Sequence, residues 1–200
     1  MAVEETEDVA FKVVVLGDSA VGKSCIVMQA AEGKFLTVMK ATIGCDYAVK
    51  RVKVGARVVK LDLWDTAGQE AYRAITRTFY RQAQAAVLVY NLTKQPTFQS
   101  IGRWLQDLRE HSGPDLPVYL AGNMQDLRAK QEVATEVARE FCRVNGVKGF
   151  AEISAKTGFG LSELFSQVAT DLLRLELSQI QLKGSRLSAQ PPPQQSGCCS

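Results

Sequence analysis

Basic runs, long apolar runs and cysteines at zinc-like spacing are all missing from this 200-residue chain. Without a segment rich in lysine and arginine, and with a net charge of only +3, no nucleic acid is expected as a partner. No apolar stretch approaches the roughly 18 residues that a membrane-spanning helix needs. Residues 1–10 are acidic, the opposite of the start of a signal peptide, so we expect no secretion.

The cysteines give no indication of a metal site. There are five of them, an odd number, and their spacing fits no zinc motif. We expect Cys25, Cys45 and Cys142 to be free thiols in a reducing cytosol. His111 is the only histidine, and we expect it to be a solvated loop residue rather than a catalytic group.

The hydrophobic content of 46% is enough to bury the core of one domain. Apolar runs predict buried parallel strands at 11–16, 85–90, 118–122 and 150–153, and a hairpin at 46–54 and 57–64. Helical spacing predicts helices after Ser24 and around 101–108, 132–144 and 161–175. This alternation predicts a doubly wound α/β domain, with a mostly parallel sheet, helices on both faces and ligand loops at the carboxyl ends of the strands.

The folded part of the chain should end near Leu177. Residues 183–200 are rich in proline, serine and glutamine and have nothing to bury, which is typical of a disordered tail. The predicted organisation is therefore an acidic extension at 1–10, a folded domain at 11–177 and a disordered tail at 178–200.

The most informative segment is GDSAVGKS at 17–24, which fits the phosphate-loop pattern G-x-x-x-x-G-K-[ST] and lies between a predicted strand and a predicted helix. Its glycines let successive N–H groups point at phosphate oxygens, and the helix N-terminus adds positive potential. Lys23 would reach the β- and γ-phosphates, and the Ser24 hydroxyl would ligate Mg²⁺. A chance glycine-rich turn is the alternative. The candidate phosphate contacts are Gly17, Asp18, Ser19, Ala20, Val21, Gly22, Lys23, Ser24 and Cys25.

A second motif, DTAGQE at 65–70, follows the strand that ends in LDLW. Asp65 could hold Mg²⁺ through water. Gly68 could bring its N–H to the γ-phosphate, and Gln69 could orient the attacking water. The alternative is an ordinary polar turn.

These motifs resemble those of a small GTPase of the Ras superfamily, and most of all the Rab family, over residues 10–177. Further stretches near the family's form lie at 43–47, 60–64, 69–76, 79–83 and 88–93. Cys45, Ala71, Gln82 and Asn91 depart from the commonest residues, so the subfamily stays open. The resemblance implies a GTP/GDP switch that hydrolyses GTP slowly and recruits effectors in vesicle traffic.

The resemblance also assigns roles and partners. Thr42 matches the switch threonine that ligates Mg²⁺ beside Ser24 and Asp65. Three aromatic residues match the effector-facing triad: Tyr47, Trp64 and Phe79. The alternative for Trp64 is a strand residue that only packs on the sheet. The implied partners are an exchange factor, a GTPase-activating protein, an escort protein and a dissociation inhibitor.

The base pocket departs from the family at one position. The family's N-K-x-D reads Asn123-Met124-Gln125-Asp126 here, and its S-A-K matches Ser154-Ala155-Lys156. Asp126 would accept from guanine N1–H and the exocyclic amine, while Asn123 would tie the pocket to the phosphate loop. The backbone of the S-A-K match would bind the guanine oxygen, and Phe35 would lie against the base.

Met124 can lie along the purine as the family's lysine does, but it cannot donate an ammonium hydrogen bond. A lost charged hydrogen bond costs about 1.5–3 kcal/mol, or roughly 10–150-fold in affinity. Binding should therefore survive in weakened form, unless another residue compensates. The alternative function is a pseudo-GTPase that serves as a binding module. A metabolite kinase would need an acceptor site and an arginine-bearing lid, and the sequence indicates neither.

The chain ends in Gly197-Cys198-Cys199-Ser200. In a Rab-like chain, this pair resembles a dual geranylgeranylation site rather than C-a-a-X. Two lipid chains give stable anchoring where one is marginal. We therefore expect Cys198 and Cys199 to hold the protein on the cytoplasmic face of a membrane, with a cytosolic pool. Two spare surface cysteines are the alternative.

Overall fold

The computed structural model describes residues 9–35, 42, 45–66 and 78–187 of the chain. The strands are β1 (Val9–Leu16), β2 (Cys45–Val54), β3 (Arg57–Thr66), β4 (Ala85–Asn91), β5 (Val118–Asn123) and β6 (Gly149–Glu152). The helices are α1 (Lys23–Glu32), α3 (Gln95–Gln99), α4 (Ile101–Ser112), α5 (Thr135–Val144) and α6 (Leu161–Leu187), with a 3₁₀ helix at Gln125–Lys130.

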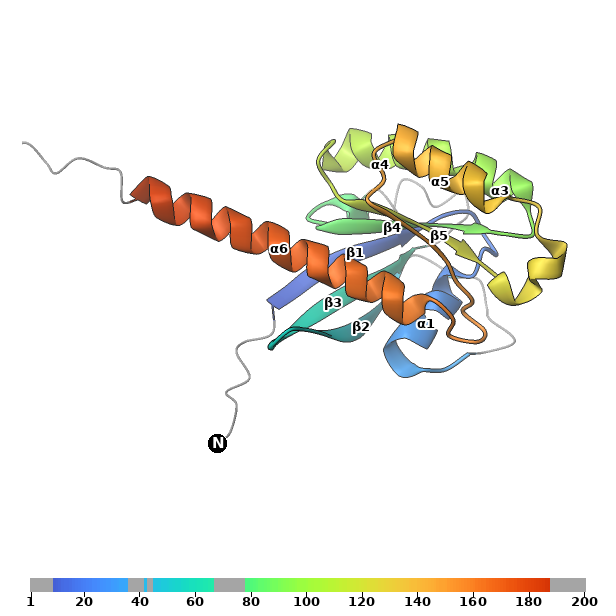
Figure 1. Cartoon of the computed structure of the whole chain (residues 1–200), viewed down its shortest axis with the longest axis horizontal. Helices are drawn as coiled ribbons and strands as arrows, with labels where there is room; N and C mark the ends of the chain where they lie inside the picture. Colours follow the sequence, from blue (N-terminus) through green and yellow to red (C-terminus); the bar gives the residue numbers. More distant parts are fainter. Residues whose placement is uncertain (1–8, 36–41, 43–44, 67–77, 188–200) are drawn as a thin grey trace, which may run out of the picture.

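The six strands form one sheet in the order β2-β3-β1-β4-β5-β6 (Figure 1). The pair β2–β3 is an antiparallel hairpin, and the other neighbouring pairs are parallel. The hairpin turns at Gly55, whose φ of 61° suits a residue without a Cβ. The prediction of a mostly parallel α/β sheet is confirmed, including the hairpin.

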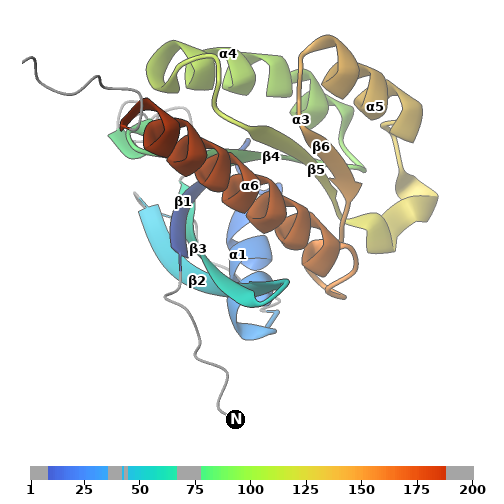
Figure 2. The same ribbon diagram turned by 60° about the vertical axis from the view of Figure 1, so that its left-hand side comes forward.

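Helices cover both faces of the sheet (Figure 2). In β1, Val13 and Val15 pack with α1 and α6, whereas Val14 and Leu16 pack with α4 and α5. Both sides of the strand are therefore buried, which is why its sequence is a continuous apolar run instead of an alternating one.

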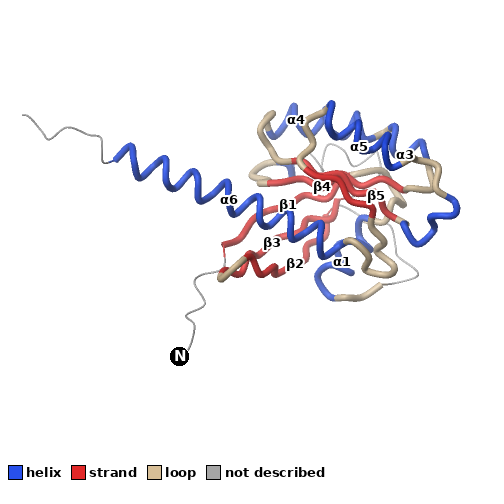
Figure 3. Tube along the Cα trace, in the orientation of Figure 1, coloured by secondary structure: helices blue, strands red, loops and turns tan. Residues whose placement is uncertain are grey.

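Helix α6 is longer than the sequence pattern predicted. It continues from 178 to Leu187, where we expected the disordered tail to have begun, and it projects past the edge of the sheet (Figure 3). Residues 178–181 are exposed, so burial does not explain this first part of the extension. The segment 178–187 contains helix formers such as Gln181 and Lys183 and no proline, although Gly184 is unfavourable in a helix. Within the described residues, no helix is both long and apolar enough to cross a membrane.

His111 lies in the last turn of α4 and not in a loop, so that prediction is wrong, although the side chain is exposed. The helix continues to Ser112 because Gly113 and Pro114 stop it only there. Cys25, Cys45 and Cys142 are free thiols, as predicted.

Candidate functional site

The carboxyl ends of four parallel strands bring the predicted site residues to one edge of the sheet. The phosphate loop follows β1, Asp65 is the last residue but one of β3, Asn123 ends β5, and Ser154 follows β6. In doubly wound folds this edge is where ligands bind.

Two glycines of the phosphate loop have no room for a side chain. Gly17 has a φ of 144°, and a Cβ there would lie 2.2 Å from the Val89 carbonyl oxygen. Gly22 has a φ of 92°, and a Cβ would lie 2.4 Å from Asn123 Nδ2. Ala20 also has a positive φ, 61°, a conformation that is unfavourable for a residue with a Cβ. The loop conformation is thus set by close packing against β4 and β5.

Lys23 lies beneath this loop with only 5% of its surface exposed. Its Nζ donates to the carbonyl oxygens of Gly17, at 2.8 Å, and Asp18, at 2.9 Å. Burial lowers the pKa of Lys23 to about 8, although Asp65 and Asp18 act in the opposite direction. An anionic group in the loop would favour the ammonium form and restore its charge.

Three oxygen-bearing side chains meet beside Lys23. Ser24 Oγ donates to Asp65 Oδ2 at 2.5 Å and lies 2.9 Å from Thr42 Oγ1, which donates to the same carboxylate oxygen at 3.1 Å. Burial raises the pKa of Asp65, while hydrogen bonding from Ser24 and the charge of Lys23 lower it.

The carboxylate of Asp65 is 2% exposed, and its Oδ1 atom has no hydrogen-bond partner among the described residues. A buried carboxylate oxygen without a partner is costly unless a cation or water satisfies it. Hydroxyl and carboxylate oxygens are the ligands that Mg²⁺ prefers. The residues therefore fit a magnesium ion, with Ser24, Thr42 and Asp65 as its candidate ligands.

Asn123 joins two loops of the site. Its side-chain Nδ2 donates to the Val21 carbonyl at 2.9 Å, and its Oδ1 accepts from the Ala155 amide at 3.0 Å. It is 2% exposed. The expected link between the base pocket and the phosphate loop is therefore present in the geometry.

Ser154 donates to Asp126 Oδ1 at 2.6 Å, which orients that carboxylate from the neighbouring loop. The other candidate base contacts are less enclosed. Met124 is half-buried in a left-handed conformation with a φ of 71°. Phe35 and Lys156 are exposed. Cys25 is half-buried, and burial raises the pKa of its thiol.

The predicted residues Gly68, Gln69, Cys198 and Cys199 lie outside the described residues. The aromatic triad lies within them. Its rings form one row, with centroids 5.6 Å apart between Tyr47 and Trp64 and again between Trp64 and Phe79. Trp64 is thus part of a continuous aromatic surface, with the ammonium of Lys12 4.7 Å from its ring centroid.

Sequence reasoning missed one contact of the phosphate loop. Trp104 Nε1 donates to Asp18 Oδ1 at 2.8 Å. The two residues are 86 positions apart, and the helical spacing at 101–108 predicts for Trp104 only a place on the apolar face of a helix. No spacing pattern could have indicated the pair.

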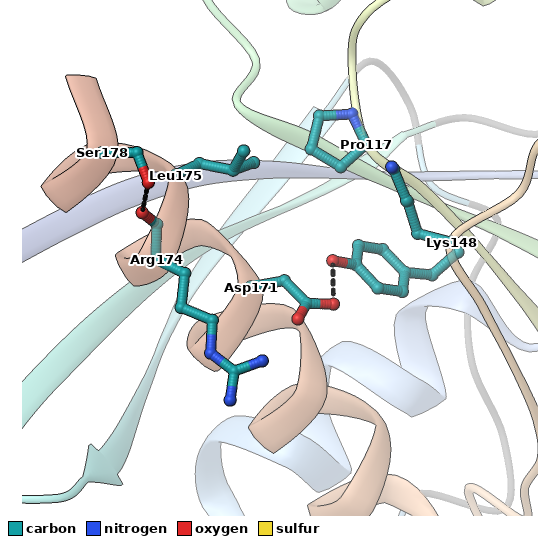
Figure 4. Close-up of a pocket in the computed structure, with 7 residues that line it drawn as sticks. Pro117, Lys148, Asp171, Arg174, Leu175 and Ser178 are labelled. Atoms are coloured by element: carbon teal, nitrogen blue, oxygen red, sulfur yellow. Dashed lines mark hydrogen bonds between the residues drawn. The ribbon is translucent and has the colours of Figure 1, made fainter. Parts of the chain in front are cut away.

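A separate pocket of about 260 Å³ lies against α6 (Figure 4), and none of the predicted site residues lines it. Asp171 accepts there from the hydroxyl of Tyr119 at 3.0 Å. Its lining is Pro117, Tyr119, Lys148, Asp171, Arg174, Leu175 and Ser178.

Comparison with known proteins agrees with this geometry. The profile of the Ras family matches residues 12–174, which include every candidate residue from Gly17 to Lys156. The GTP-binding protein ypt3 of Schizosaccharomyces pombe is 41% identical over 175 residues, covering 88% of this chain and 81% of ypt3. The Ras-related protein YPTC6 of Chlamydomonas reinhardtii is 40% identical over 172 residues, covering 86% and 79%. The Ras-related protein Rab11E of Lotus japonicus is 39% identical over 192 residues, covering 96% and 88%.

Proposed function

Because this chain belongs to the Ras family of small GTPases and is of the Rab type, we propose that it binds GDP and GTP with Mg²⁺, hydrolyses GTP slowly and recruits effectors to a membrane in vesicle traffic. The observation that carries this proposal is the meeting of three groups at one sheet edge. These are the buried Lys23 in its loop, the oxygens of Ser24, Thr42 and Asp65, and the Asn123 bridge to the base side.

The N–H groups of residues 17–25 would hold the phosphates of a bound nucleotide, and the Lys23 ammonium would neutralise the β- and γ-phosphates. Asp126, pre-oriented by Ser154, accepts from the guanine edge, which adenine cannot match. The backbone at Ala155, whose N–H donates to Asn123 Oδ1, lies on the guanine oxygen, and Phe35 and Met124 flank the purine. Mg²⁺, when bound, neutralises charge that develops on the phosphates during transfer.

Hydrolysis and switching depend on residues of the two loops beside this site. Gln69 orients the attacking water, with the Gly68 amide at the γ-phosphate. Thr42, whose hydroxyl already contacts Ser24 and Asp65, gains a contact to the γ-phosphate side only in the GTP state, so loss of the γ-phosphate loosens its loop. The row of Tyr47, Trp64 and Phe79 contacts effectors, since exposed aromatic surface is where binding energy concentrates.

Because intrinsic hydrolysis is slow, a GTPase-activating protein is needed to accelerate it. Because GDP release is slow, an exchange factor is needed to accelerate that step. An escort protein and a dissociation inhibitor handle the lipid-bearing form. Geranylgeranyl groups on Cys198 and Cys199 anchor the protein to a cytoplasmic membrane face and leave a cytosolic pool.

The nucleotide carried by the purified full-length protein tests the proposal. We expect chromatography of the denatured protein to release GDP or GTP close to one per chain. Chelation of Mg²⁺ from the native protein should accelerate nucleotide release. Protein that carries no nucleotide and takes up no added GDP would contradict the proposal.

A further inference from the structure

Trp104 is a buried core residue whose one polar atom points out of the core. It is 1% exposed and packs on α4 among Ile101, Leu105 and Leu108. Its indole N–H donates to the carboxylate of Asp18, in the first turn of the phosphate loop. A buried indole N–H normally finds a partner, and a charged acceptor makes the bond stronger than a neutral one.

Asp18 is held from two sides. Its side chain accepts from Trp104 at 2.8 Å, and its carbonyl accepts from Lys23 Nζ at 2.9 Å. The neighbouring Gly17 carbonyl accepts from the same ammonium. Trp104 therefore holds the residue whose carbonyl oxygen accepts from the buried Lys23.

Helix α4 also makes a hydrogen bond to Tyr80, on the C-terminal side of residues 67–77. Asp107, one turn along from Trp104, accepts from the hydroxyl of Tyr80 at 3.0 Å. Tyr80 is 1% exposed and packs in the same apolar cluster as Trp104. One rigid helix thus holds both the phosphate loop and the residues that follow 67–77.

We propose that Trp104 is a positioning residue of the nucleotide site, which acts through Asp18 to hold the phosphate loop closed and to slow nucleotide release. The proposal rests on the proposed binding of GDP. It predicts that the indole N–H matters to release even though Trp104 touches no nucleotide.

The substitution Trp104→Phe keeps an aromatic ring in the core and removes the N–H. We expect a fluorescent GDP analogue to dissociate roughly three- to tenfold faster, as for the loss of one hydrogen bond at a partly exposed carboxylate. The substitution Asp18→Ala should accelerate release to a similar extent. In the Asp18→Ala background, Trp104→Phe should add nothing, because the pair acts as one unit.

Tyr119→Phe is the matched control. It removes another hydrogen bond from a buried aromatic residue to a carboxylate, the 3.0 Å bond to Asp171. That bond lies in the pocket of Figure 4, which no residue of the phosphate loop lines. Tyr119→Phe should leave the release rate unchanged. A general loss of rigidity would instead accelerate release in both aromatic variants, and that outcome would overturn the proposal.

The indole N–H resonances of the GDP-bound protein give a second readout, and the two tryptophans make assignment simple. Asp18→Ala should shift the Trp104 resonance and leave that of Trp64 in place. The resonance measurement uses Asp18→Ala and therefore tests the proposal even if Trp104→Phe fails to fold. Unchanged release in Trp104→Phe, an undiminished effect in the Asp18→Ala background or an unshifted resonance would each refute the proposal. Protein that binds no GDP at all would refute the proposed function instead.

Discussion

Replacing Met124 by lysine should slow the release of GDP about tenfold, the low end of what a hydrogen bond to a charged group is worth. The backbone conformation of residue 124 accommodates either side chain. Met124 has φ 71° and ψ 35° and begins the 3₁₀ helix at Gln125–Lys130. Methionine and lysine are both unbranched at Cβ, so the cost of this left-handed conformation is similar for both, and only the tip of the side chain changes.

The size of the expected change in GDP release depends on the surroundings of residue 124. Met124 follows Asn123, whose side chain bridges the Val21 carbonyl and the Ala155 amide. Met124 itself is half-buried beside this bridge, and the resemblance to the family implies that an ammonium at residue 124 donates to the ribose ring oxygen and to the phosphate loop. A charged hydrogen bond adds about 1.5–3 kcal/mol, but a half-buried ammonium also loses hydration, which favours the lower limit.

Stopped-flow release of a fluorescent GDP analogue measures the effect. Gln125→Lys is the control, because it adds the same charge at the next residue, where the family has no lysine that binds the nucleotide. Gln125 is half-buried, as Met124 is, and the added charge alone should change release by less than twofold. Equal rates for Met124→Lys and the unmodified protein would refute the reasoning and mean that another group already fills the role of the family's lysine.

Three other predictions follow from the site. Asp126→Asn should move preference from guanine toward xanthine nucleotides, measured by competition with labelled GDP; equal displacement by ATP and GTP would contradict the assignment of Asp126. Because burial lowers the pKa of Lys23 to about 8, about half of the ligand-free molecules lack its proton at pH 8, and binding of phosphate restores it. Calorimetry at pH 8 in buffers of different ionisation enthalpy should therefore show net uptake of protons when GDP binds, and no uptake at pH 8 would contradict the role of Lys23. Changing both Cys198 and Cys199 to serine should make the protein cytosolic, and either change alone should leave partial association; cell fractionation tests this, and a double variant still on membranes would argue against the lipid anchor.

Local patterns predicted the fold and much of the site. The strands were predictable because burial on both faces demands continuous apolar runs, as in β1 and β4. The phosphate loop was predictable because its fold requires glycine at positions 17 and 22. At these positions the backbone lies so close to Val89 and Asn123 that no Cβ atom fits.

Other features depend on the folded chain as a whole. The Trp104–Asp18 bond joins residues 86 positions apart, and packing alone already accounts for a tryptophan on the buried face of α4. The extension of α6 past Leu177 was not predicted because its first residues, 178–181, are exposed and add no apolar face. The end of α4 was placed one turn early for a related reason, since His111 is exposed and adds nothing to the apolar face.

Single-turnover release of phosphate from GTP tests the central claim most directly. Protein loaded with GTP and Mg²⁺ should release phosphate slowly, and Gln69→Leu should release it several times more slowly while still binding GTP, because Gln69 acts on the water and not on the nucleotide. A protein that holds GTP but releases no phosphate, or releases it at the same rate in both forms, would contradict the account of this chain as a hydrolytic switch.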